Sequence, residues 1–312
     1  MQVVASEFRK RGGGVEEPRR ATDEEITRIH DADYLSSIRE TAGRAVALDP
    51  DTFTSPATCD VAYLAAGAAV SAVEHVLSEG DGARAMALVR PPGHHAERHR
   101  AMGFCFFNNI AIAAAYARAR GLARVAIVDY DVHHGNGTQW SFYDDPSVLF
   151  ISSHQYPYYP GTGAASDIGS GAGTGYTVNL PLVAGATDAD YDLTFAKIAL
   201  PILSQFRPDL ILISAGFDAH MDDPLAGMRL SSSCFGHLTA AIARVADECC
   251  RGRVVAITEG GYDLAALADS LRASIDALEG DHRDPAAPTG AAPRGEATIK
   301  AVTPHLSDRW RL

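Results

Sequence analysis

The stretch that decides the fold is Val125–Gln139, VAIVDYDVHHGNGTQ, in which a short apolar run ends in charged residues. The apolar run predicts a buried strand, and the glycines near its end predict where extended structure stops. Side chains alternate along an extended chain, so Asp129, Asp131 and His133 are expected on one side. A closed interior accepts two carboxylates and an imidazole when they are paired or bind a cation. Because ligands bind at the carboxyl ends of parallel strands, this stretch predicts a metal site.

Strand and helix patterns alternate along the rest of the chain. Short apolar runs predict strands, and apolar residues three or four positions apart predict helices between them. The predicted strands are 85–89, 125–129, 148–152, 176–180, 210–215 and 254–258, and the predicted helices are 60–80, 108–120, 191–206, 234–250 and 264–278. Another helical region is expected around His30, after the capping residue and acids of 22–25. This alternation predicts a single α/β domain over 1–312, with a mainly parallel sheet between helices on both faces.

Two segments are expected to be loops. The glycine-rich stretch 161–175, GTGAASDIGSGAGTG, carries neither of the glycine patterns that bind phosphate groups, so we expect a mobile loop there. Residues 281–296 are rich in proline, alanine and glycine, which predicts a loop before a short amphipathic end at 297–312.

Composition limits the class of protein. The chain has 312 residues, of which 46% are hydrophobic, and a formal net charge of −12. Such a charge argues against binding to nucleic acid or to an anionic membrane. The five cysteines are odd in number and form no C-x-x-C pair, which favours reduced thiols over a disulfide framework. With no signal peptide and no run of about 18 uncharged apolar residues, we expect a cytoplasmic protein.

Reactive residues follow each of four predicted strands. They are found in 91–95, 129–134, 214–218 and 259–262. Taken alone, the pair His94–His95 would be read as part of a structured loop, Asp218 as a turn aspartate and Tyr262 as a loop tyrosine. Because parallel strands bring their carboxyl ends to one edge of a sheet, these residues are expected to meet Asp131 and His133 in a reaction site.

Five motifs carry a resemblance to a known family. They are RPPGHHA (Arg90–Ala96), GFCFFNN (Gly103–Asn109), VDYDVHHGNG (Val128–Gly137), AGFDAH (Ala215–His220) with DPL (Asp223–Leu225), and EGGY (Glu259–Tyr262). In these motifs, over roughly 30–278, the chain resembles the zinc-dependent histone deacetylase family, which includes bacterial deacetylase-like proteins and acetylpolyamine amidohydrolases. At position 136 the chain has asparagine where other branches of the family have aspartate, and in this it resembles the class II branch. The resemblance implies an arginase/deacetylase-like α/β fold and the hydrolysis of acyl-lysine amides.

The resemblance implies a metal centre. It assigns Asp131, His133 and Asp218 as ligands to zinc, with ferrous iron as the alternative metal, and leaves positions for water and the substrate carbonyl. Two carboxylates neutralise a divalent ion, so the bound water should be less acidic than at an all-histidine site, where its pKa reaches about 7. Asp129 and Ser152 match positions around a structural monovalent cation, usually K⁺, which would offset the acids beneath the metal.

The resemblance also assigns the groups that move protons. His95 is similar to the family's general base and is held by Asn136, whereas its neighbour His94 pairs with Asp129 and stays protonated. Tyr262 is similar to the family's hydrogen-bond donor to the developing oxyanion, and such a donor can contribute about 3 kcal/mol to the transition state. We therefore expect an active hydrolase.

The expected substrate is an acyl-lysine side chain of a protein or an acetylated small amine. Gly103, Phe104 and Tyr159 match positions that line the family's acyl-lysine tunnel. Leu225 stands where polyamine-selective relatives have a glutamate, so acyl-lysine is expected to be preferred over acetylpolyamines.

Three alternatives and one departure from the family pattern remain. The competing functions are an acetylpolyamine amidohydrolase, a non-catalytic protein that binds acyl-lysine, and a ureohydrolase of the same fold with a second metal. The tandem histidines and Tyr262 favour amide hydrolysis over the ureohydrolase.

The family's usual first strand and H-P-E loop are not found. We therefore expect either a natural product longer than 312 residues or a free sheet edge that self-associates into an oligomer.

Overall fold

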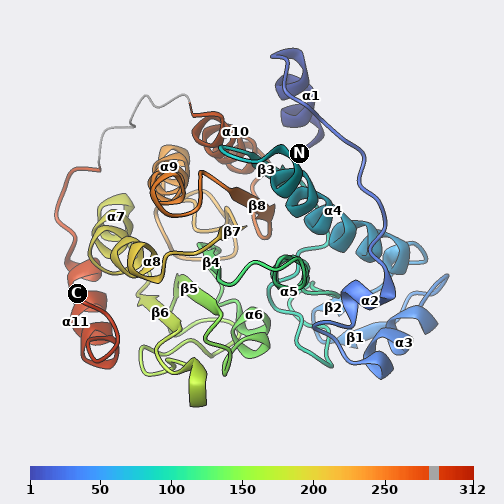
Figure 1. Cartoon of the computed structure of the whole chain (residues 1–312), viewed down its shortest axis with the longest axis horizontal. Helices are drawn as coiled ribbons and strands as arrows, with labels where there is room; N and C mark the ends of the chain where they lie inside the picture. Colours follow the sequence, from blue (N-terminus) through green and yellow to red (C-terminus); the bar gives the residue numbers. More distant parts are fainter. Residues whose placement is uncertain (281–287) are drawn as a thin grey trace.

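A parallel sheet forms the centre of the structure, which is a computed structural model describing residues 1–280 and 288–312 (Figure 1). Among these residues the strands lie in the order β3-β8-β7-β4-β5-β6, and every adjacent pair is parallel. The strands are β3 (Arg84–Ala87), β4 (Val125–Asp129), β5 (Val148–Gln155), β6 (Thr177–Leu182), β7 (Leu210–Ala215) and β8 (Val254–Thr258). The predicted α/β class with a mainly parallel sheet is therefore confirmed.

Helices cover both faces of this sheet. Their bounds are α1 (Gln2–Lys10), α2 (Asp23–Ile26), α3 (Ala32–Glu40), α4 (Thr58–Glu79), α5 (Asn109–Ala119), α6 (Asn136–Ser141), α7 (Asp188–Thr194), α8 (Leu200–Phe206), α9 (Ser232–Cys249), α10 (Leu264–Glu279) and α11 (Pro293–Leu306). Figure 1 shows α4 and α5 on one side of the strands and α7 to α10 on the other, while α11 packs beside β6 and α7. A short antiparallel ribbon, β1 (Ala47–Asp49) and β2 (Thr52–Phe53), lies apart from the sheet.

The central strands are buried because helices pack on both faces. All residues of β4, β5, β7 and β8 are buried. Along β4, Ala126 and Val128 face the core under α7 to α10, and Val125 and Ile127 face the core under α4 and α5. Continuous apolar runs are typical of parallel strands that are covered in this way. Burying a Val or Ile side chain fully stabilises the folded state by about 1.5–3 kcal/mol relative to leaving it exposed. This burial holds the ends of the strands in place.

The register of the central strands brings their carboxyl ends together. Asp129 at the end of β4 is paired with Ser152 of β5 and with Ser214 of β7. Next to them, Ala215 is level with Thr258 of β8. The segments that follow β4, β7 and β8 therefore leave the sheet side by side.

Most predicted elements are confirmed, with small shifts at their ends. The strands 125–129, 210–215 and 254–258 have the predicted bounds. The expected helix 191–206 is not regular: α7 is followed by a π-helical stretch, Phe195–Ala199, and then by α8, which has Pro201 in its first turn. Proline has no N–H to donate within a helix, so the regular hydrogen-bond pattern is interrupted before it.

Three parts of the structure are not predicted from the sequence. Helix α1 forms in a segment without an apolar run, because Val4 is buried in the core and Glu7 accepts hydrogen bonds from Arg272 of α10. The ribbon β1–β2 is too short and too exposed to show a strand pattern. Helix α11 begins at Pro293, inside the loop expected at 281–296, which corrects that boundary, and residues 281–287 lie outside the described part of the chain.

The long helix α4 is apolar enough to be compared with a membrane span. It has 22 residues with a mean hydropathy of 1.4 over an 18-residue window, and 50% of that window is buried inside the structure. Its buried alanine and valine residues pack against α5 and the sheet. Its composition is therefore explained by its place in the core, as expected for 60–80.

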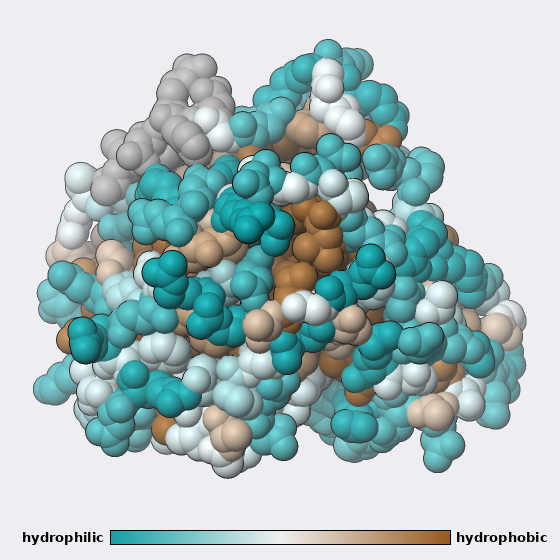
Figure 2. All heavy atoms as spheres, viewed as in Figure 1, coloured by the Kyte–Doolittle hydropathy of each residue, from teal (hydrophilic) through white to brown (hydrophobic). Residues whose placement is uncertain are grey.

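The surface shown in Figure 2 is dominated by hydrophilic side chains, with apolar side chains visible in a hollow near β3 and α4. In the described part of the chain, β3 forms one edge of the sheet and β6 the other. Self-association through such an edge stays a prediction. The stretch 161–175 is a loop, as expected, with one short 3-10 turn at Gly171–Gly173, and its mobility stays a prediction.

Candidate active site

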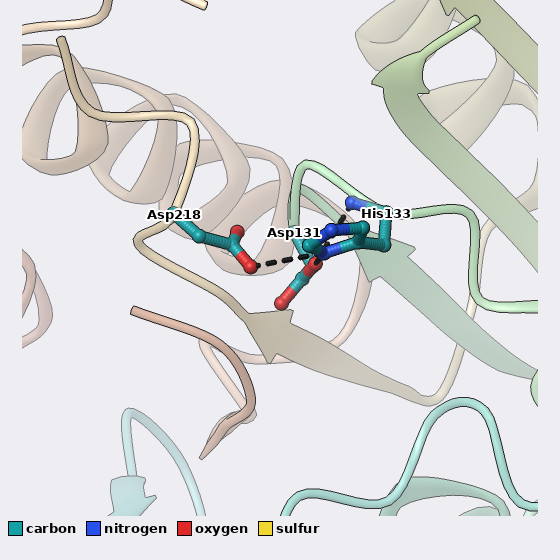
Figure 3. Close-up of side chains that lie close together, drawn as sticks. All are labelled: Asp131, His133 and Asp218. Atoms are coloured by element: carbon teal, nitrogen blue, oxygen red, sulfur yellow. Dashed lines mark hydrogen bonds and ion pairs between the residues drawn. The ribbon is translucent and has the colours of Figure 1, made fainter. Parts of the chain in front are cut away.

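The segments after β4 and β7 bring three side chains to one point (Figure 3). The Nδ1 atom of His133 lies 3.2 Å from Asp131 Oδ1 and 3.1 Å from Asp218 Oδ2. One ligand atom of each residue lies within 4.8 Å of the other two. Asp131 and Asp218 are fully buried, and His133 is 9% exposed. The structure thus brings the three predicted metal ligands together.

These residues follow the strand at the end that the sequence predicts. Strand β4 ends at Asp129, so Asp131 and His133 lie on the loop beyond it and not on the strand itself. Hydrogen bonds within the loop hold them: the N–H of Asp131 donates to Asp129 Oδ1 at 3.1 Å, and the N–H of His133 donates to Asp131 Oδ1 at 2.9 Å. Tyr130 and Val132 still face the apolar core on the other side.

Two glycines let neighbouring segments approach the ligands closely. A Cβ atom at Gly216 would lie 2.0 Å from Asp131 Oδ2, and one at Gly260 would lie 2.1 Å from Asp218 Oδ2. The N–H of Gly260 donates to Asp131 Oδ2 at 2.8 Å, and the N–H of Val132 donates to Asp218 Oδ1 at 2.9 Å. These backbone contacts fix the orientation of both carboxylates.

The electrostatics of this cluster suit a divalent cation. Burial raises the pKa of Asp218 to about 6, and the negative charge of Asp131 adds to this effect. Burial favours the neutral form of His133, but the two neighbouring carboxylates outweigh it and raise the pKa of His133 to about 11. The site therefore attracts positive charge strongly. Carboxylates and imidazole are ordinary zinc ligands, so the donor set fits the expected metal.

His94 is placed beside the acids behind the ligands. Its Nδ1 lies 3.0 Å from Asp129 Oδ2, and its Nε2 lies 3.8 Å from Asp131 Oδ1. Burial opposes a charged ring, but the two carboxylates outweigh it and raise the pKa of His94 to about 10. The backbone N–H of His94 donates to Glu259 Oε2 at 3.2 Å. This environment keeps His94 as an imidazolium.

His95 has a different environment from its neighbour. Its Nδ1 lies 2.8 Å from Asn136 Oδ1, so this nitrogen carries the proton. Its ring centroid is 4.1 Å from that of His94, and it lines a pocket that opens above the metal-ligand cluster. Burial, together with the charge on His94, lowers the pKa of His95 well below its usual range. The ring is therefore neutral, with Nε2 as the unprotonated nitrogen.

Tyr262 lines the same pocket. Its ring centroid is 6.1 Å from that of Phe104, and the guanidinium of Arg90 lies 5.7 Å from the ring. The backbone N–H of Tyr262 donates to Asp223 Oδ2 at 2.7 Å. Burial raises the pKa of the Tyr262 hydroxyl, so this group is a neutral hydrogen-bond donor at ordinary pH.

The four predicted substrate-binding residues all line this pocket: Gly103, Phe104, Tyr159 and Leu225. Phe104 has a φ of 65°, a left-handed conformation that is rare for a non-glycine residue, and the residue is 38% exposed. The ring of Tyr159 is edge-on to His95, with centroids 5.2 Å apart. Leu225 is 38% exposed, and its carbonyl accepts a hydrogen bond from the Tyr158 hydroxyl.

The two residues expected around a monovalent cation are neighbours in the sheet. Asp129 and Ser152 are paired across β4 and β5, and both are fully buried. Ser152 Oγ lies 3.0 Å from His154 Nδ1. Neither Asp129 nor Ser152 lines the pocket, and the cation site stays a prediction.

Three residues of the site are assigned no role from the sequence. Asp51, in the turn between β1 and β2, lines the pocket and accepts from the N–H of Gly103 at 3.1 Å. Glu97 Oε1 accepts from Asn136 Nδ2 at 2.8 Å. Glu259 accepts backbone hydrogen bonds from the segment that carries the histidine pair, and burial raises its pKa to about 7. Of the three, Glu259 has a sequence signal, because it directly follows a predicted strand.

The fold and this site define a class of protein: an α/β domain with a buried carboxylate and histidine metal centre at the carboxyl edge of a parallel sheet. A family model described as the histone deacetylase domain matches residues 2–278. The chain belongs to the histone deacetylase family.

Several relatives share this similarity over most of the chain. Histone deacetylase 14, chloroplastic, of Arabidopsis thaliana is 42% identical over 273 residues, which cover 84% of this chain and 64% of the relative. A probable deacetylase of Archaeoglobus fulgidus is 40% identical over 248 residues, covering 80% and 69%. Polyamine deacetylase HDAC10 of Homo sapiens is 39% identical over 312 residues, covering 94% and 45%. The chain therefore spans less than two thirds of the Arabidopsis relative and under half of the human one.

The fold agrees with a solved structure of the family. The crystal structure of the HDA15 HD domain matches with a TM-score of 0.91 and 36% sequence identity, over 99% of this chain and 86% of that one. The predicted family and fold are confirmed.

Proposed function

We propose that this protein is a metal-dependent amidohydrolase that removes acetyl or other acyl groups from lysine side chains. The observation that carries the proposal is one pocket lined by Asp131, His94, His95, His133 and Tyr262. A ligand set for a metal, a neutral imidazole, a charged imidazole and a hydroxyl donor are the groups that hydrolysis of an amide by activated water requires.

The metal would be held by Asp131, His133 and Asp218, whose donor atoms converge. Zinc suits these ligands, with ferrous iron as the alternative. When bound, the metal polarises the amide carbonyl and lowers the pKa of water. Proton transfer and stabilisation of the developing negative charge would be supplied by the side chains around the metal.

Three side chains would handle protons and developing charge. His95 is neutral and its Nδ1 proton is directed at Asn136, so Nε2 can accept a proton from the attacking water and return it to the departing amine. His94 stays charged beside Asp129 and would stabilise negative charge in the pocket. Tyr262 would donate its hydroxyl hydrogen bond to the oxyanion.

The rim of the pocket supports lysine as the substrate side chain. Phe104 and Tyr159 provide aromatic walls for an aliphatic stem. Leu225 at the rim offers no charge to a second ammonium group, whereas a peptidyl lysine brings neutral backbone to that place. We therefore propose acyl-lysine in proteins as the preferred substrate.

An acetylpolyamine is the second candidate substrate. The observation that favours it is the carboxylate of Asp51, which lines the same pocket and could pair with a remote ammonium group. Polyamine deacetylase HDAC10 of Homo sapiens, at 39% identity, is named for that activity.

The proposal also includes a structural cation, a cellular location and the classes of partner that are not expected. We infer a structural K⁺ near Asp129 and Ser152, supported by their burial beneath the ligands. All five cysteines are free, which supports a reducing, cytoplasmic location. The net charge of −12 supports the absence of nucleic-acid and membrane partners.

A panel of acyl-lysine peptides assayed beside acetylated spermidine and putrescine tests this function. The expected result is hydrolysis with a larger kcat/KM for acetyl-lysine peptides, and Leu225→Glu should shift the ratio toward the polyamines. An equal or larger kcat/KM for acetylspermidine would establish the second candidate. If the zinc-loaded protein hydrolyses none of these amides, the proposed activity is wrong.

A further inference from the structure

A line of hydrogen bonds runs from the histidine pair to the protein surface. His95 Nδ1 lies 2.8 Å from Asn136 Oδ1, and Asn136 Nδ2 donates to Glu97 Oε1 at 2.8 Å. His95 and Asn136 are buried, whereas the side chain of Glu97 is 17% exposed. We propose that Glu97 is a positioning residue that acts through Asn136 and determines which nitrogen of His95 carries the proton.

The chemical reason lies in the symmetry of an asparagine side chain. Its amide has an acceptor end and a donor end of nearly the same shape, so Asn136 alone could present either end to His95. A carboxylate only accepts hydrogen bonds, so Glu97 requires the Nδ2 end to face it. Oδ1 must then face His95, whose Nδ1 must donate. Nε2 remains as the nitrogen that can accept a proton in the pocket.

The alternative partner of the amide is too weak to replace the carboxylate. Asn136 Nδ2 also lies 3.4 Å from Met102 Sδ, and a thioether is a weak acceptor. Arg100 donates to Glu97 Oε1 at 3.1 Å and keeps positive charge beside the carboxylate. The preference of Asn136 for one orientation therefore depends on Glu97.

The backbone that carries Glu97 is itself fixed. The N–H of Glu97 donates to the carbonyl of Arg100 at 2.9 Å, which closes a tight turn. The carbonyl of Glu97 lies 3.0 Å from His30 Nδ1, and the N–H of Asn108 donates to His30 Nε2 at 2.9 Å. Burial lowers the pKa of His30 to about 4, so this ring is neutral and its Nδ1 donates to Glu97. The carboxylate is thus presented to Asn136 from a rigid turn.

This inference rests on the proposed hydrolase activity with His95 as base, and a first pair of variants tests it. Glu97→Ala removes the acceptor and should lower kcat about tenfold, with KM and zinc content unchanged. Glu97→Gln keeps an acceptor oxygen, and Arg100, which donates to that same atom, holds the oxygen end of the new amide toward Asn136, so this variant should stay within about threefold of wild type. Asp31→Asn is the matched control, because Asp31 pairs with Arg98 of the same turn, and it should retain full activity.

A reciprocal exchange separates positioning from a merely structural role. Asn136→Asp places a second carboxylate against Glu97 and should lower kcat about a hundredfold through repulsion. Adding Glu97→Gln allows the glutamine amide to donate to the new carboxylate, so the double variant should recover at least about tenfold over Asn136→Asp. A role of Glu97 in folding alone would not produce this recovery.

Nitrogen NMR of labelled histidine gives a readout that does not depend on turnover. His95 should be protonated at Nδ1 in wild type and Glu97→Gln, and should become a mixture of tautomers in Glu97→Ala. Unchanged kcat and an unchanged tautomer in Glu97→Ala, or additive losses without recovery in the double variant, would overturn the inference. Absence of hydrolysis by zinc-loaded wild type would instead reject the proposed function, and the tautomer measurement would then decide the role of Glu97.

Discussion

Gly260 lies so close to Asp218 that a Cβ atom on it would stand 2.1 Å from Asp218 Oδ2 and 2.6 Å from Asp131 Oδ2. The N–H of the same residue donates to Asp131 Oδ2 at 2.8 Å. Glycine is therefore required at this position by the space that the ligands occupy. The backbone of the segment after β8 packs against the two carboxylates and keeps them in position for the proposed metal.

Gly260→Ala should abolish tight metal binding. The added methyl group must displace the carboxylate of Asp218, of Asp131 or of both, and so break the backbone hydrogen bonds that orient them. Elemental analysis after gel filtration measures the bound metal. Gly14→Ala, where a Cβ meets no atom within 4 Å, is the control and should bind metal as wild type does. Normal metal content in Gly260→Ala would contradict the assigned ligands.

Tyr262→Phe should lower kcat about a hundredfold while the fold and the metal content persist. The substitution removes the hydroxyl that we propose donates to the substrate oxygen as negative charge develops there. Steady-state kinetics and circular dichroism check the two parts of this prediction. Tyr116→Phe, which removes a hydroxyl on α5 that donates to Glu74, serves as the control. A loss of less than about threefold would remove Tyr262 from the mechanism.

The free energy of unfolding should fall as the pH drops from about 6.5 toward about 4, in part through His30. Burial lowers the pKa of His30 to about 4 in the folded protein, whereas in the unfolded chain it is close to the ordinary value of about 6.5. Between these values the unfolded chain binds a proton that the folded chain does not, so acid favours unfolding. The contribution of His30 is about 2 kcal/mol between about pH 7 and pH 5.

Urea unfolding of wild type and His30→Gln, each at about pH 7 and about pH 5, measures this effect. Glutamine can still donate to the Glu97 carbonyl, but it does not titrate in this range. The variant should lose about 2 kcal/mol less than wild type on acidification. Identical pH dependence in the two proteins would show that His30 does not take part.

An element of this structure is predicted from the sequence when its burial leaves a clear hydrophobic pattern. The strands at 125–129, 210–215 and 254–258 are predicted to the residue, because burial on both faces leaves a continuous apolar run with sharp ends. The ribbon β1–β2 is not predicted, because its few residues are partly exposed and carry no periodicity. Its contribution to the pocket, Asp51, is missed for the same reason.

The proposed metal ligands and the histidine pair lie in motifs that follow predicted strands, so the topology of the sheet is enough to bring them together. Glu97 is different. Its partner Asn136 lies 39 residues further along the chain, and their contact depends on a turn held by His30. No local pattern reports such a contact, so the structure is needed to find it. The loop position of Asp131 is likewise set by hydrogen bonds beyond the strand and not by strand alternation.

The central claim is that Asp131, His133 and Asp218 bind the metal that makes this pocket an amidohydrolase. One titration tests it most directly: metal-free protein is given increasing Zn²⁺, and bound metal and acetate release from an acetyl-lysine peptide are measured in the same samples. The account predicts binding of about one equivalent with activity rising in proportion, and neither in Asp218→Ala. The control Asp222→Ala, at a side chain that is 71% exposed, should match wild type. Full metal occupancy with unchanged activity in Asp218→Ala would contradict the claim.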